Sequence, residues 1–215
     1  MKINIVSEFF GTMGLLIVVV GSGIMGESLS QGNAAIALLA NALATGAGLY
    51  ALIQTFGPIS GAHFNPAVSL YAFLNKKISL NNLASYCVAQ IIGAISGVII
   101  THAMFGQQLL QFSTHDRSDL RFFFSEFIAT SGLLLVIAMT SKWNSDKTAT
   151  TVAMFITAAY WCTSSTSFAN PAVTIARSFT NSFAGIQLNG VPGFVAAQVA
   201  SVFVIYLTLN FDKKS

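Results

Sequence analysis

Two short stretches of the chain combine residues that begin a helix with side-chain amides that can donate hydrogen bonds in front of it. They are residues 60–68, Ser-Gly-Ala-His-Phe-Asn-Pro-Ala-Val, and residues 167–173, Ser-Phe-Ala-Asn-Pro-Ala-Val. Asn65 and Asn170 stand where an N-cap is favoured. Pro66 and Pro171 follow at the first helical position, where no N–H is needed. Each asparagine keeps NH₂ donors to spare, and each helix start places about half a positive charge before it.

Both helix starts follow long apolar segments in a chain that is poor in charge. Hydrophobic residues make up 54% of the sequence and charged residues 8%, with a mean hydropathy of +0.70. Soluble domains carry about 25% charged residues, and the apolar runs of about twenty residues suit membrane helices. The composition therefore indicates an integral membrane protein. A net charge of +3 without a lysine or arginine run argues against a nucleic-acid partner.

The two cysteines give no indication of a metal site. Cys87 and Cys162 both fall in apolar segments and have no metal-ligand spacing, so we interpret them as buried thiols that act as small apolar side chains. No pairing of a nucleophile with a base is evident either. We therefore expect no metal, no cofactor and no enzymatic activity.

Six apolar segments are predicted to cross the membrane: residues 4–26, 34–56, 83–104, 122–141, 148–163 and 191–210. Two short helices, residues 68–75 and a second ending near residue 179, are too short to cross. A signal peptide is the alternative for the first segment, because Lys2 precedes an apolar run. Glu8 within the segment and the lack of a small-residue cleavage site argue against it. Gly93 and Gly97 have the G-x-x-x-G spacing of closely packed helices.

The halves of this single domain, residues 1–215, repeat one another. Glu8 and Glu126 each stand in a Ser-Glu-Phe sequence, and Gln90 in the third span matches Gln198 in the sixth. The repeats cover about residues 4–106 and 120–211. Each has three spans and one short helix, and an odd number of spans inverts the second repeat relative to the first.

Lysines and arginines predict the orientation of the chain. One side of the membrane would hold seven lysines, namely Lys2, Lys76, Lys77, Lys142, Lys147, Lys213 and Lys214. The other side would hold Arg117, Arg121 and Arg177. Since positive loops stay inside, both termini are expected in the cytoplasm. The polar loop at residues 106–121, which includes Arg117, is interpreted as solvated.

Inversion would bring the two short helices in from opposite faces, so that their starts meet near the midplane. Ala67 and Ala172 are small enough to allow that contact. Non-helical backbone at this depth must be sheltered by protein or line a watery cavity. Its free carbonyls would line a path for a polar, uncharged solute, at Gly61, Ala62, His63, Thr166, Ser167 and Phe168. The two positive helix starts would oppose cations.

The chain resembles the aquaporin (major intrinsic protein) family over nearly its whole length, most specifically at residues 60–68. The resemblance implies an all-α, right-handed bundle of six transmembrane helices with two re-entrant half-helices. It also implies a homotetramer in the cell membrane with one pore per subunit for water and small neutral solutes. Glu8 and Glu126 would accept hydrogen bonds from the re-entrant loops instead of relaying protons, and His63 would be a wall residue. A secondary transporter built on an inverted repeat is the alternative function.

The sequence departs from the family at the selectivity filter. Val173 replaces the usual arginine, and the other filter positions, counted from the two asparagines, are Thr45, Ala158 and Ser167. Four small side chains predict a wider and less positive filter. Arg177 lies one turn beyond Val173, and its side chain can either lean back toward the filter or pair with loop carbonyls in the outer vestibule.

The pattern after the second asparagine resembles a bacterial branch of the family that lacks the filter arginine and is linked to arsenic detoxification. In that branch the permeants would be glycerol-like polyols and arsenous acid. The hydroxyls of Thr45 and Ser167 are compatible with a solute of three hydroxyls.

Overall fold

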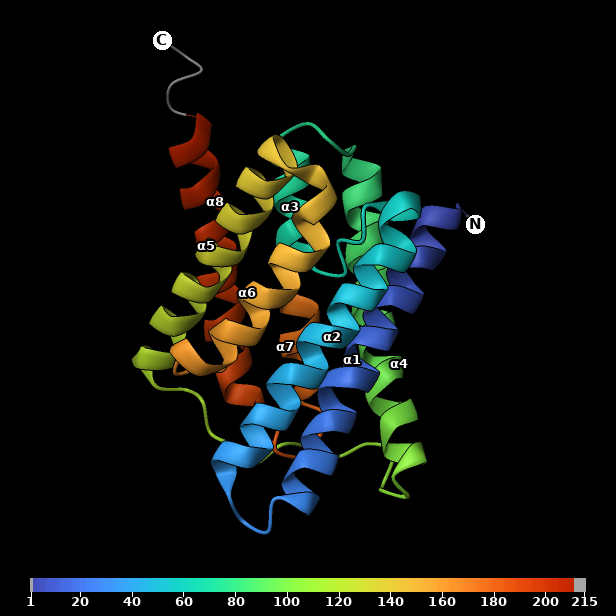
Figure 1. Cartoon of the computed structure of the whole chain (residues 1–215), viewed down its shortest axis with the longest axis vertical. Coiled ribbons are helices and arrows are strands. Elements are labelled where there is room, and N and C mark those ends of the chain that lie inside the picture. Colours follow the sequence, from blue (N-terminus) through green and yellow to red (C-terminus); the bar gives the residue numbers. More distant parts are fainter. Residues whose placement is uncertain (1, 211–215) are drawn as a thin grey trace.

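The structure is a computed structural model that describes residues 2–210, and every regular element in this range is helical (Figure 1). The helices are α1 (Ile3–Leu29), α2 (Ala34–Ser60), α3 (Pro66–Leu74), α4 (Leu80–Met104), α5 (Leu120–Trp143), α6 (Thr148–Cys162), α7 (Pro171–Arg177) and α8 (Val191–Asn210), with 3₁₀ turns η1 (Ser145–Lys147) and η2 (Leu188–Gly190). All eight predicted helical segments are present. Residue 211 and the predicted cytoplasmic Lys213 and Lys214 lie outside the described residues.

Among the residues that the structure describes, five helices are long and apolar enough to cross a membrane, at Ile3–Leu29, Ala34–Ser60, Leu80–Met104, Leu120–Trp143 and Leu188–Asn210. The fifth predicted span, α6, is shorter than these. Its 15 residues rise only about 22 Å at about 1.5 Å per residue. The helix ends because Thr163 adopts an extended conformation, with φ −120° and ψ 136°, and begins the second re-entrant segment.

The helices of the two halves pack in matching pairs. Helix α1 contacts α2 and α4, and α5 contacts α6 and α8. The short helix α3 packs on α4 and α8, whereas α7 packs on α8 and α4, and α3 and α7 contact each other. Figure 1 shows α3 near the end of the bundle where α1 begins, and α7 farther from that end, near the middle of the bundle. The two short helices therefore approach each other inside the bundle.

The close packing of α1 on α4 depends on glycines, as their spacing predicts. A Cβ at Gly93 would overlap the carbonyl oxygen of Phe9, and one at Gly97 would overlap the carbonyl oxygen of Met13. Because both neighbours are helix backbone, a side chain at either position requires the helices to separate.

We expect Gly93→Ala to destabilise the protein by about 1–3 kcal/mol, since an overpacked helix contact must open. Thermal unfolding of the detergent-solubilised protein measures the effect. Gly21→Ala is the matched control in α1, because a Cβ there lies 3.6 Å from Phe105 and 3.7 Å from Thr101, an ordinary contact. Equal melting temperatures for the two variants would contradict the close-contact explanation.

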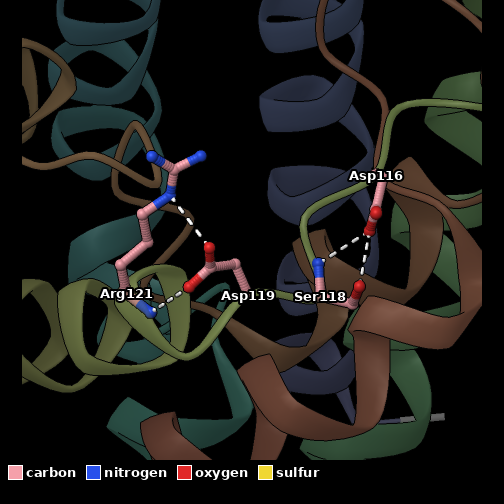
Figure 2. Close-up of polar contacts among 4 residues, drawn as sticks. All are labelled: Asp116, Ser118, Asp119 and Arg121. Atoms are coloured by element: carbon pink, nitrogen blue, oxygen red, sulfur yellow. Dashed lines mark hydrogen bonds and ion pairs between the residues drawn. The ribbon is translucent and has the colours of Figure 1, made fainter.

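The polar loop before α5 is only partly solvated. Its acids are exposed. Asp116 Oδ1 accepts hydrogen bonds from the Ser118 N–H (2.9 Å) and hydroxyl (2.6 Å), which lower the pKa of Asp116 (Figure 2). Asp119 Oδ1 accepts from the Arg121 N–H (2.9 Å) at the start of α5. Arg117 instead turns inward and is half-buried. The prediction of a wholly solvated loop is therefore wrong for Arg117, because its guanidinium finds carbonyl acceptors inside the bundle.

Candidate functional site

The two short helices begin as the sequence predicts. Asn65 Oδ1 accepts a hydrogen bond from the Ala67 N–H at 2.8 Å. Asn170 Oδ1 accepts from the N–H groups of Ala172 at 3.0 Å and Val173 at 3.3 Å. Both asparagines are extended N-caps with proline at the next position, so each side-chain oxygen is used to start its helix.

The side-chain NH₂ groups of the asparagines connect the two repeats. Asn65 Nδ2 donates to the Ala169 carbonyl at 2.7 Å, and Asn170 Nδ2 donates to the Phe64 carbonyl at 2.8 Å. Each asparagine thus bonds the residue that precedes the other asparagine. An amide NH₂ has two donors, so one N–H of each remains for another acceptor. The sequence indicated spare donors but not this reciprocal pairing.

A buried glutamate holds the first re-entrant segment. Glu8, which is fully buried, accepts hydrogen bonds from the backbone N–H groups of His63 (3.0 Å) and Phe64 (2.7 Å). The hydroxyl of Ser60 (2.6 Å) and Nε2 of Gln90 (2.8 Å) donate to the same carboxylate. Glu8 therefore fixes the backbone that leads into Asn65.

Glu126 holds the second segment in the corresponding way. It too is fully buried, and it accepts from the N–H groups of Phe168 (2.9 Å) and Ala169 (2.8 Å) and from Nε2 of Gln198 (2.6 Å). Gln198 also donates to the Thr174 hydroxyl at 2.9 Å. Each carboxylate thus accepts hydrogen bonds from its own re-entrant segment and from a glutamine of a neighbouring helix.

The backbone of the two re-entrant segments is strained, and the strain allows its hydrogen bonds to the buried glutamates. Several non-glycine residues have left-handed φ values between 47° and 61°: Ala62, Phe64, Thr166, Ser167 and Ala169. Such conformations cost of order 1 kcal/mol or more each and persist only when the surroundings enforce them. Here the turns direct successive N–H groups toward the buried carboxylates, which offset the strain through charge-assisted hydrogen bonds.

One cavity of about 590 Å³ contains both asparagines in its wall. The wall includes Lys77 and Lys142 at the end where α3 finishes, and it reaches Arg177 at the end of α7. Other predicted residues that line it are Thr45, Gly61, Ala62, His63, Ser167, Phe168 and Val173. The cavity therefore extends along the N-termini of both α3 and α7.

Of the predicted pore-centre residues, only the two asparagines line this cavity, and Pro66, Ala67, Pro171 and Ala172 do not. Among the predicted filter residues and pore carbonyls, two are missing from its wall. Thr166 is absent from the wall, and Ala158 is exposed on α6. Ile156 and Tyr160 line the cavity instead and are buried. At about 100° per helical residue, position 158 lies about 200° from either of them. The filter prediction at Ala158 is therefore wrong, and the wall holds a tyrosine whose hydroxyl is 3.4 Å from Thr45 Oγ1.

Arg177 lies against the cavity and also bonds a loop carbonyl, so it satisfies features of both sequence interpretations. Its side chain is 2% exposed. Nε donates to the Ala184 carbonyl, and the guanidinium carbon is 3.4 Å from the ring centroid of Phe168. Nη1 has no hydrogen-bond partner within residues 2–210.

Arg117 reaches the same aromatic ring from the polar loop. Its Nε donates to the Gly185 carbonyl at 3.1 Å and its Nη1 to the Ser165 carbonyl at 3.0 Å. Its guanidinium carbon is 5.3 Å from the Phe168 centroid. Arg117 does not line the cavity. It therefore connects loops, whereas Arg177 faces the cavity.

His63 and the cysteines take no part in a reactive cluster. His63 Nδ1 lies 3.0 Å from the Ser69 hydroxyl, and the ring packs edge-on against Tyr86. Cys162 is exposed and Cys87 is half-buried. The prediction of a buried Cys162 is wrong, because the thiol lies on the outward side of an apolar helix, and neither cysteine lines the cavity.

Three comparisons place this geometry among known proteins. Residues 1–163 match the profile of the family described as major intrinsic protein. The chain is 46% identical over 194 residues to the aquaglyceroporin AqpS of Rhizobium meliloti (strain 1021), covering 90% of this chain and 83% of that protein. It is 38% identical to human aquaporin-2 over 96 residues, 45% of this chain and 34% of that protein, so the match spans about a third of the human relative.

The fold also has a counterpart among solved structures. The X-ray structure of the aquaglyceroporin from Plasmodium falciparum superposes with a TM-score of 0.75 at 22% sequence identity. The match covers 96% of this chain and 95% of that one. At this identity the likeness concerns the fold alone.

Proposed function

The chain belongs to the major intrinsic protein family, and from that premise we propose that it is a passive membrane channel for water and small neutral solutes such as glycerol. The observation that carries the proposal is the pair of asparagines in one cavity wall. Their mutual bonds to Ala169 and Phe64 hold both amides at the point where α3 and α7 meet.

The geometry suits an uncharged solute that both donates and accepts hydrogen bonds. At the centre, Asn65 and Asn170 each keep one N–H for a solute oxygen. Gly61, Ala62 and His63 of the first re-entrant segment lie in the same wall, and their carbonyls would accept hydrogen bonds from solute hydroxyls. The positive starts of two helices disfavour a cation at the centre. Alternating donors and acceptors thus replace the hydration shell of a neutral molecule.

Arsenous acid is a further proposed permeant. It is neutral, small and carries three hydroxyls, and the hydroxyls of Thr45 and Ser167 in the cavity wall can exchange hydrogen bonds with it. The Rhizobium relative is named an aquaglyceroporin, which supports passage of solutes larger than water. Glycerol and arsenous acid have similar hydrogen-bonding surfaces, so one channel can serve both.

The proposed assembly is a homotetramer in the cell membrane, with one pore in each subunit and lipid around the bundle. The matching contacts of α1 with α4 and of α5 with α8 support two repeats, and the lysines on one side of the predicted topology support a cytoplasmic N-terminus. Large apolar side chains on the outer faces of the helices are exposed in the single chain, among them Leu43, Ile92 and Phe203. Contact with lipid or with neighbouring subunits would cover them.

Flux measurements test the proposal. The purified protein is reconstituted in liposomes, and stopped-flow light scattering records the permeation of water, glycerol and arsenite beside protein-free liposomes. A channel gives rates that rise in proportion to the gradient. Saturation at low solute concentration, or dependence on a proton gradient, would instead support the secondary transporter. No flux above that of protein-free liposomes would refute both.

Val173→Arg is expected to reduce glycerol and arsenite flux by roughly tenfold, about 1.4 kcal/mol in the barrier, with a smaller effect on water. Val173 is buried in the cavity wall, so a long cationic side chain would occupy the path. Val173→Leu adds bulk without charge and is the control. Unchanged glycerol and arsenite fluxes in the arginine variant would show that position 173 does not limit passage.

A further inference from the structure

The cavity wall holds a cation at a position that the sequence alone does not assign to it. Valine at position 173 predicts a less positive filter, yet Arg177, one turn farther along α7, lies in the same wall. The side chain is 2% exposed, which excludes a freely solvated guanidinium. Its role depends on what holds it and on what it faces.

Two contacts fix the guanidinium. Nε donates to the carbonyl of Ala184, and the flat face of the group lies on the ring of Phe168, with 3.4 Å between the guanidinium carbon and the ring centroid. Stacking on an aromatic ring and one backbone bond together leave little rotational freedom. Arg177 therefore presents its remaining N–H groups in a defined direction.

Two buried polar atoms of this wall have no partner. Arg177 Nη1 and Ser167 Oγ make no hydrogen bond within the described chain, and both residues line the cavity. A buried donor left without an acceptor costs about 1–3 kcal/mol, and more when it is charged. A water or solute oxygen in the cavity removes that cost, so these atoms select for molecules that bring an acceptor.

Within the described part of the chain, no carboxylate forms an ion pair with Arg177. The one ion pair found within residues 2–210 joins Arg121 to Asp119 at 3.5 Å, on the exposed loop. The same wall also includes Tyr160, a larger side chain than the predicted Ala158. This end of the cavity is thus positive and is lined by an aromatic residue, contrary to the wider, less positive filter that the sequence predicts.

We propose that Arg177 is a specificity-determining residue of the channel: it donates Nη1 to the oxygen of each passing solute and repels cations, in place of a cation at position 173. The inference rests on the proposed channel function. Arg117 has a different role, because its Nε and Nη1 are both occupied by loop carbonyls and it lies outside the cavity wall.

Arg177→Gln removes the positive charge and keeps a polar side chain at the same position. We expect it to raise proton leak through the channel by roughly tenfold or more, equal to at least about 1.4 kcal/mol of barrier, and to raise the ratio of glycerol to water flux. Proton leak is recorded with a pH-sensitive dye in liposomes under a potassium diffusion potential, and fluxes by stopped flow. Arg121→Gln, which removes an exposed arginine with 69% relative side-chain exposure, is the matched control and should match the wild type in both measurements.

Two further variants keep the test decisive if loss of the Ala184 bond impairs folding. Arg177→Lys keeps the charge but not the planar group, so we expect wild-type proton exclusion with an altered glycerol-to-water ratio. In the double variant Val173→Arg with Arg177→Gln, the cation introduced one turn earlier on α7 should restore proton exclusion. Wild-type proton leak and flux ratio in a folded Arg177→Gln protein, or a wild-type ratio in Arg177→Lys, would overturn the inference. Absent flux in the wild type would instead refute the channel itself.

Discussion

Glu126→Ala is expected to destabilise the folded protein by roughly 3 kcal/mol or more, because several buried donors lose a charged acceptor at once. Glu126 accepts from the N–H groups of Phe168 and Ala169 and from Nε2 of Gln198, at 2.6–2.9 Å. Alanine brings no acceptor to any of them, and membrane surroundings provide none. Thermal unfolding of the detergent-solubilised protein, together with water flux in liposomes, measures the loss.

Glu27 offers the matched control for this substitution. Glu27 is exposed at the end of α1 and accepts one backbone hydrogen bond, from Phe183 at 3.1 Å. Removing it should change stability by no more than about 1 kcal/mol, as for an ordinary surface site. Glu126→Gln keeps one acceptor oxygen and should fall between the two. If the Glu126→Ala protein had the same melting temperature as the Glu27→Ala protein, the second re-entrant segment would not depend on the carboxylate.

The helices were predictable from the sequence because their signals are local. Apolar runs bounded by polar residues identify the long helices, and an asparagine before a proline identifies the starts of α3 and α7 at Pro66 and Pro171. The role of the paired glutamates as loop supports was predicted only from the resemblance to the family, and the observed hydrogen bonds give its physical reason. A buried acid needs donors, and the repeat places each acid in register with a segment that is rich in free N–H groups.

The face that α6 presents to the cavity was not predictable by counting residues. Its rotation is set by a contact with another helix: Thr157 fills the space that Gly46 of α2 leaves open, and a Cβ at Gly46 would overlap the Thr157 hydroxyl. With Thr157 directed toward α2, Ile156 and Tyr160 face the cavity and Ala158 faces outward. A non-local contact thus decides which residue a helix contributes.

The position of Arg177 depends in the same way on distant parts of the chain. The sequence left its guanidinium either near the filter or in the vestibule, and the structure combines a loop carbonyl with the cavity wall. The Ala184 carbonyl and the Phe168 ring come from the segments on either side of α7. Neither the path of the loop nor the orientation of the ring follows from residue types, so the position of the guanidinium could not be predicted from the sequence.

Asn170→Asp is expected to abolish most water and glycerol passage, with at least a roughly tenfold loss, or about 1.4 kcal/mol in the barrier. Aspartate keeps the N-cap oxygen that accepts from Ala172 and Val173. The NH₂ that donates to the Phe64 carbonyl at 2.8 Å becomes a second oxygen, so two acceptors oppose each other. The two helix starts must then separate, and a negative charge replaces a donor in the cavity.

The control for Asn170→Asp isolates the lost donor from the change of charge at a helix start. Asn33 caps α2 through its oxygen, which accepts from Ala35 at 3.1 Å and Ile36 at 3.2 Å, and it is exposed outside the cavity wall. Asn33→Asp should therefore leave flux unchanged, since both residues cap well. If Asn170→Asp permeated water and glycerol like Asn33→Asp, the NH₂ groups would be dispensable for passage. The reciprocal bonds would then only support the fold, and the solute would take its hydrogen bonds elsewhere along the wall.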